Sequence, residues 1–251
     1  NSAEAETEAY YQRLLREHPD GRLRILRYPG RFNYAAIHNF AVPQAAGEYL
    51  ILLNNDTEVR SEGWIEELLG LCQQDRVGVV GAKLYYPDGT IQHAGVVLGL
   101  CGVASHLFIG ADGERDGYAG RLVSVQDYSA VTAACMMTRK AVYEQVAGME
   151  ESLAVAYNDI DYCMKLQTAG WHVLFTPYAE LTHYESQSRG LEDTEEKQRR
   201  FQEEARRFVQ RWEAQLDAGD PYYNPNLSVT KTDCSLRMPW EQEAWRKLCT
   251  D

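Results

Sequence analysis

The 251-residue sequence lacks a long apolar segment and a cluster of basic residues. No run approaches the roughly 20 apolar residues that a helix needs to span a bilayer, and the N-terminus lacks the basic and apolar parts of a signal peptide. Lys and Arg number 25 against 37 Asp and Glu, for a formal charge of -12. Because binding to nucleic acid requires clustered cations, we expect no nucleic-acid partner. A phosphate ligand has to be held by a metal or by individual Arg side chains.

Paired cysteines are also missing, since the six cysteines form no Cys-x-x-Cys motif and several lie in apolar runs. This pattern predicts reduced, buried thiols in a cytoplasmic protein, and it argues against a structural zinc site or a disulfide framework. The length and the 45% hydrophobic content allow one large globular core. No internal repeat is visible, so we expect a single domain of catalytic size.

Predicted strands and helices alternate along the first half of the chain. Helices are expected over residues 3–18, 33–46 and 61–74, with Asn33 as a helix cap, and strands over residues 22–28, 49–53 and 77–84. Pro87, Asp88 and Gly89 predict a hairpin turn into residues 91–98. This alternation predicts an α/β fold with a mixed, mainly parallel sheet and helices on both faces.

The second half contains fewer strands. We expect a strand over residues 128–138, a short helix over residues 140–146, and a strand over residues 171–176. Residues 191–216 form a charged amphipathic pattern, which predicts a long helix with one apolar stripe. The remaining residues to 251 are expected to lie as a tail on the domain, because their Tyr and Trp side chains need burial.

The apolar run of residues 49–53 ends in Asn54, Asn55 and Asp56. Such a run predicts a fully buried strand whose carboxyl end opens into a site. Residues two apart on an extended chain share a side, so Asn54 and Asp56 can face one Mg²⁺ or Mn²⁺ ion that carries phosphate oxygens. The alternative is a plain turn that caps the next helix.

A second group of acids is predicted at the start of a helix capped by Asn158. The cap would place Asp159 and Asp161 in the first helical turn, where either carboxylate can serve as a general base. The alternative is that these acids only complement the helix dipole. His93, beside the glycine-rich loop of residues 99–120, is a weaker candidate for lining a site.

A third group follows the strand predicted at residues 171–176. His183 can offer an imidazole to a metal, Ser186 and Ser188 can donate to phosphate, and Arg189 can bind phosphate with two hydrogen bonds. For a single histidine, a structural role is the competing interpretation.

The order of these motifs along the chain resembles that of family 2 glycosyltransferases, above all bacterial rhamnosyltransferase-like enzymes of cell-surface polysaccharide synthesis. The resemblance covers residues 10–223 and rests on several segments. They are Phe-Asn-Tyr-Ala-Ala-Ile-His-Asn at 32–39, Leu-Asn-Asn-Asp-Thr at 53–57, Gln-His-Ala-Gly at 92–95, Ala-Val-Thr-Ala-Ala-Cys at 130–135, Asn-Asp-Ile-Asp-Tyr-Cys at 158–163 and His-Tyr-Glu-Ser at 183–186.

The resemblance implies a GT-A fold, related to the Rossmann fold, and an inverting transfer of sugar from a nucleotide diphosphate sugar to an acceptor hydroxyl. It implies that Asp56 and His183 bind Mn²⁺ or Mg²⁺ and that Asp159 is the catalytic base. Asn54 stands where the family has the first acid of its Asp-x-Asp motif, so one charge is missing. The remaining implied roles are acceptor or site-lining positions for Asp161, His93 and Asn158, and diphosphate binding for Ser186, Ser188 and Arg189.

The resemblance also implies partners and a domain plan. Family members open with a strand of the Val-Ser-Ile-Ile-Ile-Pro type, followed by a second strand that ends in Asp-Asn-Gly-Ser. Neither strand appears here. We therefore expect an N-terminally incomplete GT-A domain over residues 1–190, with residues 191–251 packed on it. Expected partners are the sugar donor, a glycan or lipid-linked glycan acceptor, a second copy that covers the open sheet edge, and the inner face of the cell membrane.

Two other functions remain open from the sequence. The first is a binding module for glycan or nucleotide that keeps the fold without turnover. The second is a metal-dependent phosphohydrolase, which is disfavoured because no second carboxylate-rich cluster is visible.

Overall fold

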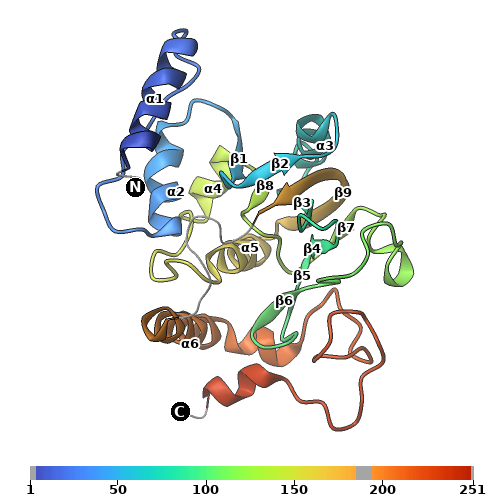
Figure 1. The fold of residues 1–251 in the computed structure, drawn as a ribbon. Coiled ribbons are helices and arrows are strands. Elements are labelled where there is room, and N and C mark those ends of the chain that lie inside the picture. Colours follow the sequence, from blue (N-terminus) through green and yellow to red (C-terminus); the bar gives the residue numbers. More distant parts are fainter. Residues whose placement is uncertain (1–3, 185–193, 250–251) are drawn as a thin grey trace.

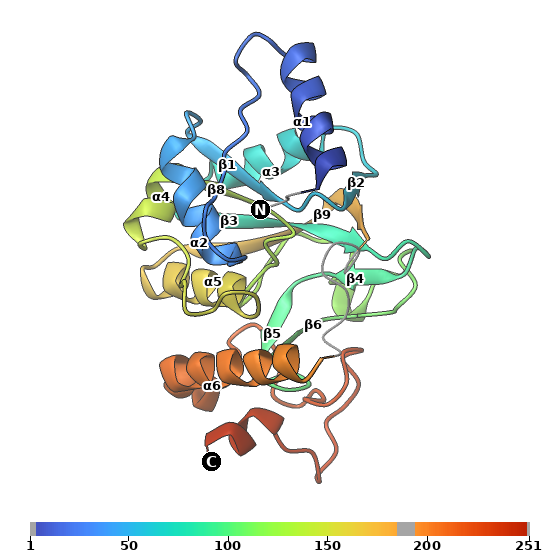
Figure 2. The same ribbon diagram turned by 60° about the vertical axis from the view of Figure 1, so that its left-hand side comes forward.

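The computed structural model describes residues 4–184 and 194–249 (Figures 1 and 2). In chain order its elements are α1 (Ala5–Glu17), α2 (Tyr34–Ala41), β1 (Tyr49–Leu53), β2 (Thr57–Val59), α3 (Trp64–Cys72), β3 (Val77–Tyr85), β4 (Ile91–His93), β5 (Val96–Leu98), β6 (Ala104–His106), β7 (Gln126–Asp127), β8 (Cys135–Arg139), α4 (Lys140–Gln145), α5 (Asn158–Thr168), β9 (His172–His183) and α6 (Glu195–Ala218), with short 3₁₀ helices at Val42–Gln44, Tyr118–Gly120 and Ala244–Cys249. The strict alternation of helix and strand expected for the first half is not observed, because α1 leads directly to α2 and β1 directly to β2.

The main sheet has the strand order β1-β8-β3-β9-β2, with β4 beside β3 and β7 beside β9. The α/β class and the mixed sheet are confirmed. The expectation of a mainly parallel sheet is wrong, because β3 and β9 form the one parallel pair among the described strands. The reason is that β8 lies between β1 and β3 and runs opposite to both.

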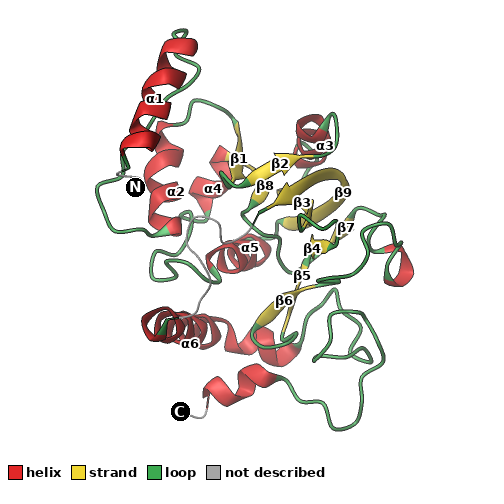
Figure 3. Ribbon diagram, viewed as in Figure 1, coloured by secondary structure: helices red, strands yellow, loops and turns green. Residues whose placement is uncertain are grey.

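Helices cover both faces of this sheet, as expected (Figures 2 and 3). Alternate side chains of β3 point to opposite faces. Val80, Ala82 and Leu84 pack in one hydrophobic cluster with α3. Val79 packs in a second, larger cluster with side chains of α2, α4, α5 and α6. These two hydrophobic clusters fix the strands of the main sheet in place, including those whose ends border the cavity described below.

Two predicted strand features do not occur. Residues 22–28 form no strand, because no other segment pairs with them, and Arg27 instead pairs with Glu8 of α1. β1 is not fully buried, since it is the last strand at its edge of the described sheet, and Leu53 is 44% exposed. Both outcomes depend on neighbouring strands, which a local apolar run does not reveal.

Of the two predicted helix caps, one is confirmed and one is wrong. The Asn33 side chain accepts a hydrogen bond from the Ala36 amide at 3.0 Å and caps α2, as expected. The predicted cap of α5 is wrong by one residue, because Tyr157 is the cap, in a left-handed backbone conformation. Asn158 instead lies in the first helical turn, and its amide donates to the Leu153 and Val155 carbonyls.

The C-terminal residues pack on the domain through α6. Phe208 and Trp212 are buried in the larger cluster, and in the tail Trp245 is 1% exposed, whereas Trp240 is 73% exposed. The tail is thus held by some of its aromatic residues, while the domain boundary at residue 190 stays a prediction. Across the described ranges, no helix has both the length and the apolar character that crossing a bilayer requires.

Candidate active site

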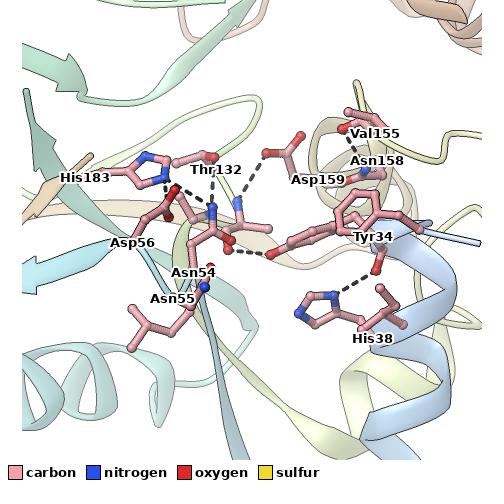
Figure 4. Close-up of a pocket in the computed structure, with 15 residues that line it drawn as sticks. Tyr34, His38, Asn54, Asn55, Asp56, Thr132, Val155, Asn158, Asp159 and His183 are labelled. Carbon is pink, nitrogen blue, oxygen red and sulfur yellow. Dashed lines mark hydrogen bonds and ion pairs between the residues drawn. The ribbon is translucent and has the colours of Figure 1, made fainter. Parts of the chain in front are cut away.

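A cavity of about 480 Å³ opens at the carboxyl end of β1 (Figure 4). It is bounded by α2, the turn after β1, the segment before β8, the start of α5 and the end of β9. Its lining residues are Phe32, Tyr34, Ile37, His38, Leu53, Asn54, Asn55, Asp56, Thr132, Ala133, Ala134, Val155, Asn158, Asp159 and His183. Residues from all three predicted motif groups therefore meet at one place.

Asp56 and His183 form one side of this cavity. The β2–β9 pairing sets Thr57 opposite His183, which brings the preceding Asp56 beside the imidazole. His183 Nε2 lies 3.1 Å from Asp56 Oδ1 and 3.2 Å from the Asn54 amide nitrogen. The turn is held by the Tyr184 amide, which donates to the Asp56 carbonyl at 2.8 Å. Asn54, Asp56 and His183 are thus brought together as expected.

Gln92, buried behind His183, determines which imidazole nitrogen faces the cavity. The Gln92 amide nitrogen donates to the His183 carbonyl at 3.2 Å, so its oxygen is left to face His183 Nδ1 at 2.7 Å. In the neutral imidazole Nδ1 therefore carries the proton, and Nε2 presents a lone pair towards Asp56 and Asn54. A second hydrogen bond that orients the ring in this way is typical of metal-binding histidines.

The residues present fit a divalent cation. They supply one imidazole nitrogen, one carboxylate and one amide on one cavity wall, and no cluster of three His, Cys, Asp or Glu exists within residues 4–184 and 194–249. So sparse a set suits an ion that takes its other ligands from a diphosphate and water. A lone pair facing a carboxylate oxygen at 3.1 Å is also an arrangement that a cation relieves.

Asp159 lies on the opposite side of the cavity from Asp56 and His183 (Figure 4). Its Oδ2 accepts a hydrogen bond from the Ala133 amide at 3.2 Å, and its Oδ1 accepts one from the Ile160 amide at 2.9 Å. These bonds fix the carboxylate at the first turn of α5, where the helix dipole favours a negative charge. One carboxylate on the side away from the metal-type cluster is the arrangement that a general base requires.

Tyr34 and His38 of α2 form a wall of the cavity, and the sequence motifs had assigned them no role. The Tyr34 hydroxyl donates to the Ala133 carbonyl at 2.8 Å, so the residue whose amide holds Asp159 is itself held on its other side. Burial and the nearby Asp159 raise the pKa of Tyr34, which keeps it a neutral donor. His38 Nδ1 donates to the Tyr34 carbonyl at 2.9 Å, and burial lowers its pKa. The sequence feature that could have identified this wall is the segment at residues 32–39, which was used above only as part of the family resemblance.

Two predicted site residues lie elsewhere. Asp161 does not line the cavity and is fully buried, since it faces α6, where it accepts from Trp212 Nε1 at 2.9 Å. His93 is also fully buried behind the cavity wall, and its Nε2 accepts from the Thr132 amide at 3.4 Å. The expectation that either residue lines the site is corrected, because helix and strand geometry turns both towards the core.

The remaining predictions have mixed placement. Asn158 borders the cavity, but its side-chain amide is committed to carbonyl groups of the preceding loop. Ser186, Ser188 and Arg189 lie outside the described residues. Their role at a diphosphate stays a prediction.

The family model described as glycosyltransferase like family 2 matches residues 1–208. The chain belongs to this family. The family named from the motifs is therefore confirmed, and the cavity described above lies in the part of this glycosyltransferase chain that the family model covers.

Curated relatives support the same assignment. The uncharacterised protein y4gI of Sinorhizobium fredii is 48% identical over 95% of this chain and 26% of its own length. The O-antigen biosynthesis protein RfbC of Myxococcus xanthus is 40% identical over 100% of this chain and 19% of its own length. An N-acetylglucosaminyl-diphospho-decaprenol L-rhamnosyltransferase of Mycobacterium tuberculosis is 25% identical over 73% of this chain and 65% of its own length. The chain thus spans only about a quarter or less of the first two relatives.

Solved glycosyltransferase structures share the fold. GalNAc-T7, solved with UDP, GalNAc and Mn²⁺, superposes with a TM-score of 0.62 over 86% of this chain and 41% of its own, at 14% identity. The mannosyltransferase PcManGT from Pyrobaculum calidifontis, in complex with GDP-Man and Mn²⁺, gives 0.56 over 86% and 53%, at 14% identity. The GT-A fold implied by the motifs is therefore confirmed.

Proposed function

We propose that this chain carries the catalytic site of an inverting glycosyltransferase that moves a sugar from a nucleotide diphosphate sugar to an acceptor hydroxyl. The observation that carries the proposal is the cavity itself, which has Asp159 on one side and the Asp56 and His183 pair on the other. Inverting transfer requires a base on the face of the sugar opposite the leaving diphosphate. The two sides of the cavity meet that requirement.

The residues would divide the work as follows. Asp159 takes the proton from the acceptor hydroxyl, while Tyr34, through its bond to Ala133, helps to keep the Asp159 carboxylate in place. His183 and Asp56 would hold Mn²⁺ or Mg²⁺, and Asn54 would offer its amide oxygen to the same ion. When bound, the ion offsets the charge that develops on the leaving diphosphate. We assign diphosphate binding to Ser186, Ser188 and Arg189 on the family likeness alone.

The biological setting is part of the proposal. The named relatives include an O-antigen biosynthesis protein and a rhamnosyltransferase that acts on a lipid-linked sugar, by its name. We therefore propose a glycan or lipid-linked glycan acceptor in bacterial cell-surface polysaccharide synthesis. The corresponding location is the cytoplasm, with peripheral contact to the inner face of the cell membrane.

One observation favours a second function, binding of nucleotide sugar or glycan without turnover. The outer edge of β1 has no partner strand among the described residues, and Leu53 at the cavity rim is 44% exposed. An open edge beside the cavity leaves this wall of the site uncovered unless another strand or a second copy of the chain pairs with it.

The test is turnover with a panel of nucleotide diphosphate sugars and Mn²⁺, for the wild type and Asp159→Asn. We expect this change to lower turnover by about 10²- to 10⁴-fold, because the amide cannot accept the proton, while donor binding persists. Asp116→Asn, an exposed control, should leave turnover unchanged. Equal turnover in Asp159→Asn would remove the base assignment, and donor binding without turnover in the wild type would favour the binding module.

A further inference from the structure

The buried acid Glu204 on α6 points at the loop before α5. Glu204 is 2% exposed, and its Oε2 accepts hydrogen bonds from the amides of Ala156 at 2.6 Å and Val155 at 3.3 Å. Its nearest cation, Arg200 Nε, is farther, at 3.8 Å from Oε1. Burying a carboxylate costs free energy unless its oxygens accept hydrogen bonds, and these two amides offset much of that cost.

The loop that Glu204 holds leads directly to the proposed base. Val155 lines the cavity, and Asp159 follows only three residues after Ala156. Between them, Tyr157 has a φ of 63°, a left-handed conformation that a non-glycine residue keeps only where its surroundings enforce it. The backbone therefore turns sharply, between a contact to α6 and the first turn of α5.

Other side chains of α6 enforce the same turn. The Tyr157 ring packs between Phe201 and Phe208, with ring centres 5.5 Å apart in both cases. Two residues beyond Asp159, the buried Asp161 accepts from Trp212 of the same helix. Helix α6 thus contacts the chain both before and after Asp159, although α6 itself does not line the cavity.

We propose that Glu204 is a positioning residue that places Asp159 for proton transfer by holding the two backbone amides before Tyr157. The inference rests on the proposed function. Glu204 does not touch the cavity, so its effect has to pass through the backbone of residues 155–159. Nothing else in the described chain accepts a hydrogen bond from these two amides.

The decisive experiment compares Glu204→Ala with Glu204→Gln. Loss of the acceptor in Glu204→Ala should lower kcat by about 10- to 100-fold, because small displacements of a catalytic group cost that much, while donor KM and binding stoichiometry stay unchanged. Glu204→Gln keeps an oxygen that can accept from both amides, so it should restore kcat to near the wild-type value. Glu203→Ala, an exposed neighbour on α6, is the matched control.

A double-mutant cycle separates positioning from general destabilisation. If Glu204 acts through Asp159, Glu204→Ala should have no further effect on the residual turnover of Asp159→Asn. The same fold-loss in both backgrounds would overturn the proposal, and so would an unchanged kcat in Glu204→Ala.

Amide hydrogen exchange tests the structural half without turnover. In Glu204→Ala, the amides of residues 155–161 should exchange faster, while those of β3 and β8 keep their wild-type rates. If the wild type shows no turnover, the proposed function fails on its own evidence. Unchanged exchange at residues 155–161 would then still overturn the role of Glu204.

Discussion

At the scale of single residues, His183 shows how a neighbour defines a site. Its Nδ1 is committed to Gln92, and its Nε2 is directed at Asp56 and Asn54. The ring is thus oriented by a second hydrogen bond, as is typical of metal-binding histidines. Asn54, which stands where the family motif has an acid, leaves this wall with one negative charge fewer.

The metal affinity of the cavity follows from that charge. Asp56→Ala and His183→Ala should each abolish Mn²⁺ binding, because each removes a main donor. Asn54→Asp should tighten binding about tenfold, since affinity rises with the number of charged ligands. Calorimetric titration with Mn²⁺ measures all three.

Asn55→Asp is the matched control for the added charge, because Asn55 is exposed, whereas the Asn54 amide lies 3.2 Å from His183 Nε2. Tighter binding in Asn55→Asp than in Asn54→Asp would contradict the assignment, as would unaltered binding in Asp56→Ala.

Gly95, in the segment at 92–95, is required by packing. Its φ is +89°, and a Cβ atom there would lie 2.5 Å from the ring of Tyr128. Gly95→Ala should therefore destabilise the fold by about 2–4 kcal/mol, from backbone strain and a clash with a buried ring. Gly110→Ala isolates the strain, because Gly110 has a φ of +75° in open space. Urea unfolding of both variants checks this, and equal losses would refute the clash.

At the scale of elements, α6 is anchored to α5 through charge as well as apolar contact. Asp161 Oδ1 accepts from Trp212 at 2.9 Å and lies 3.1 Å from Arg211 Nε, and Lys165 Nζ lies 3.5 Å from Oδ2. Burial lowers the pKa of Lys165, whereas Asp161 opposes that shift. The acid that resembled a site residue in the sequence therefore connects two helices.

Removing this acid should loosen the contact between the helices. Asp161→Ala is expected to lower the free energy of unfolding by about 2–3 kcal/mol, because the buried Trp212 N–H loses its acceptor. Denaturant titration followed by Trp fluorescence measures the loss. Asp217→Ala, which breaks an exposed pair with Arg246, should have little effect. A similar loss in both variants would contradict the anchoring role.

At the scale of the whole molecule, stability should depend on pH through the buried His93 and the partly buried His38. Burial lowers the pKa of His38, and burial together with His106 and His183 lowers that of His93. In the unfolded chain these groups take up a proton near their ordinary pKa of about 6.5, whereas in the folded chain they do so only at lower pH. Stability is therefore fully present above that value and decreases as pH falls below it.

Replacing His38 should reduce this dependence. We expect the slope of unfolding free energy against pH, between about pH 6.5 and 5, to fall in His38→Gln by at most about 1.4 kcal/mol per pH unit, the limit for one proton. Urea unfolding at a series of pH values measures the slope. An identical slope in wild type and variant would show that His38 takes up its proton equally in both states.

The elements that sequence alone predicted well are those with strong local signals. The apolar period of α3, the amphipathic stripe of α6 and the Asn33 cap of α2 are all present in the structure. The strand expected at residues 22–28 and the full burial of β1 failed, because both depend on which segments pair, and pairing involves residues far apart in the chain.

For the site, the sequence by itself determined which functional groups are available, namely the carboxylates of Asp56 and Asp159 and the imidazole of His183. Only the tertiary structure decided which of these groups meet. The register that sets Thr57 opposite His183 joins residues more than a hundred positions apart, and the two-residue step from Asp159, about half a helical turn, directs Asp161 to α6 instead of the cavity. Residue types follow from the chain, but their distances follow from strand pairing and helix rotation, which no local pattern encodes.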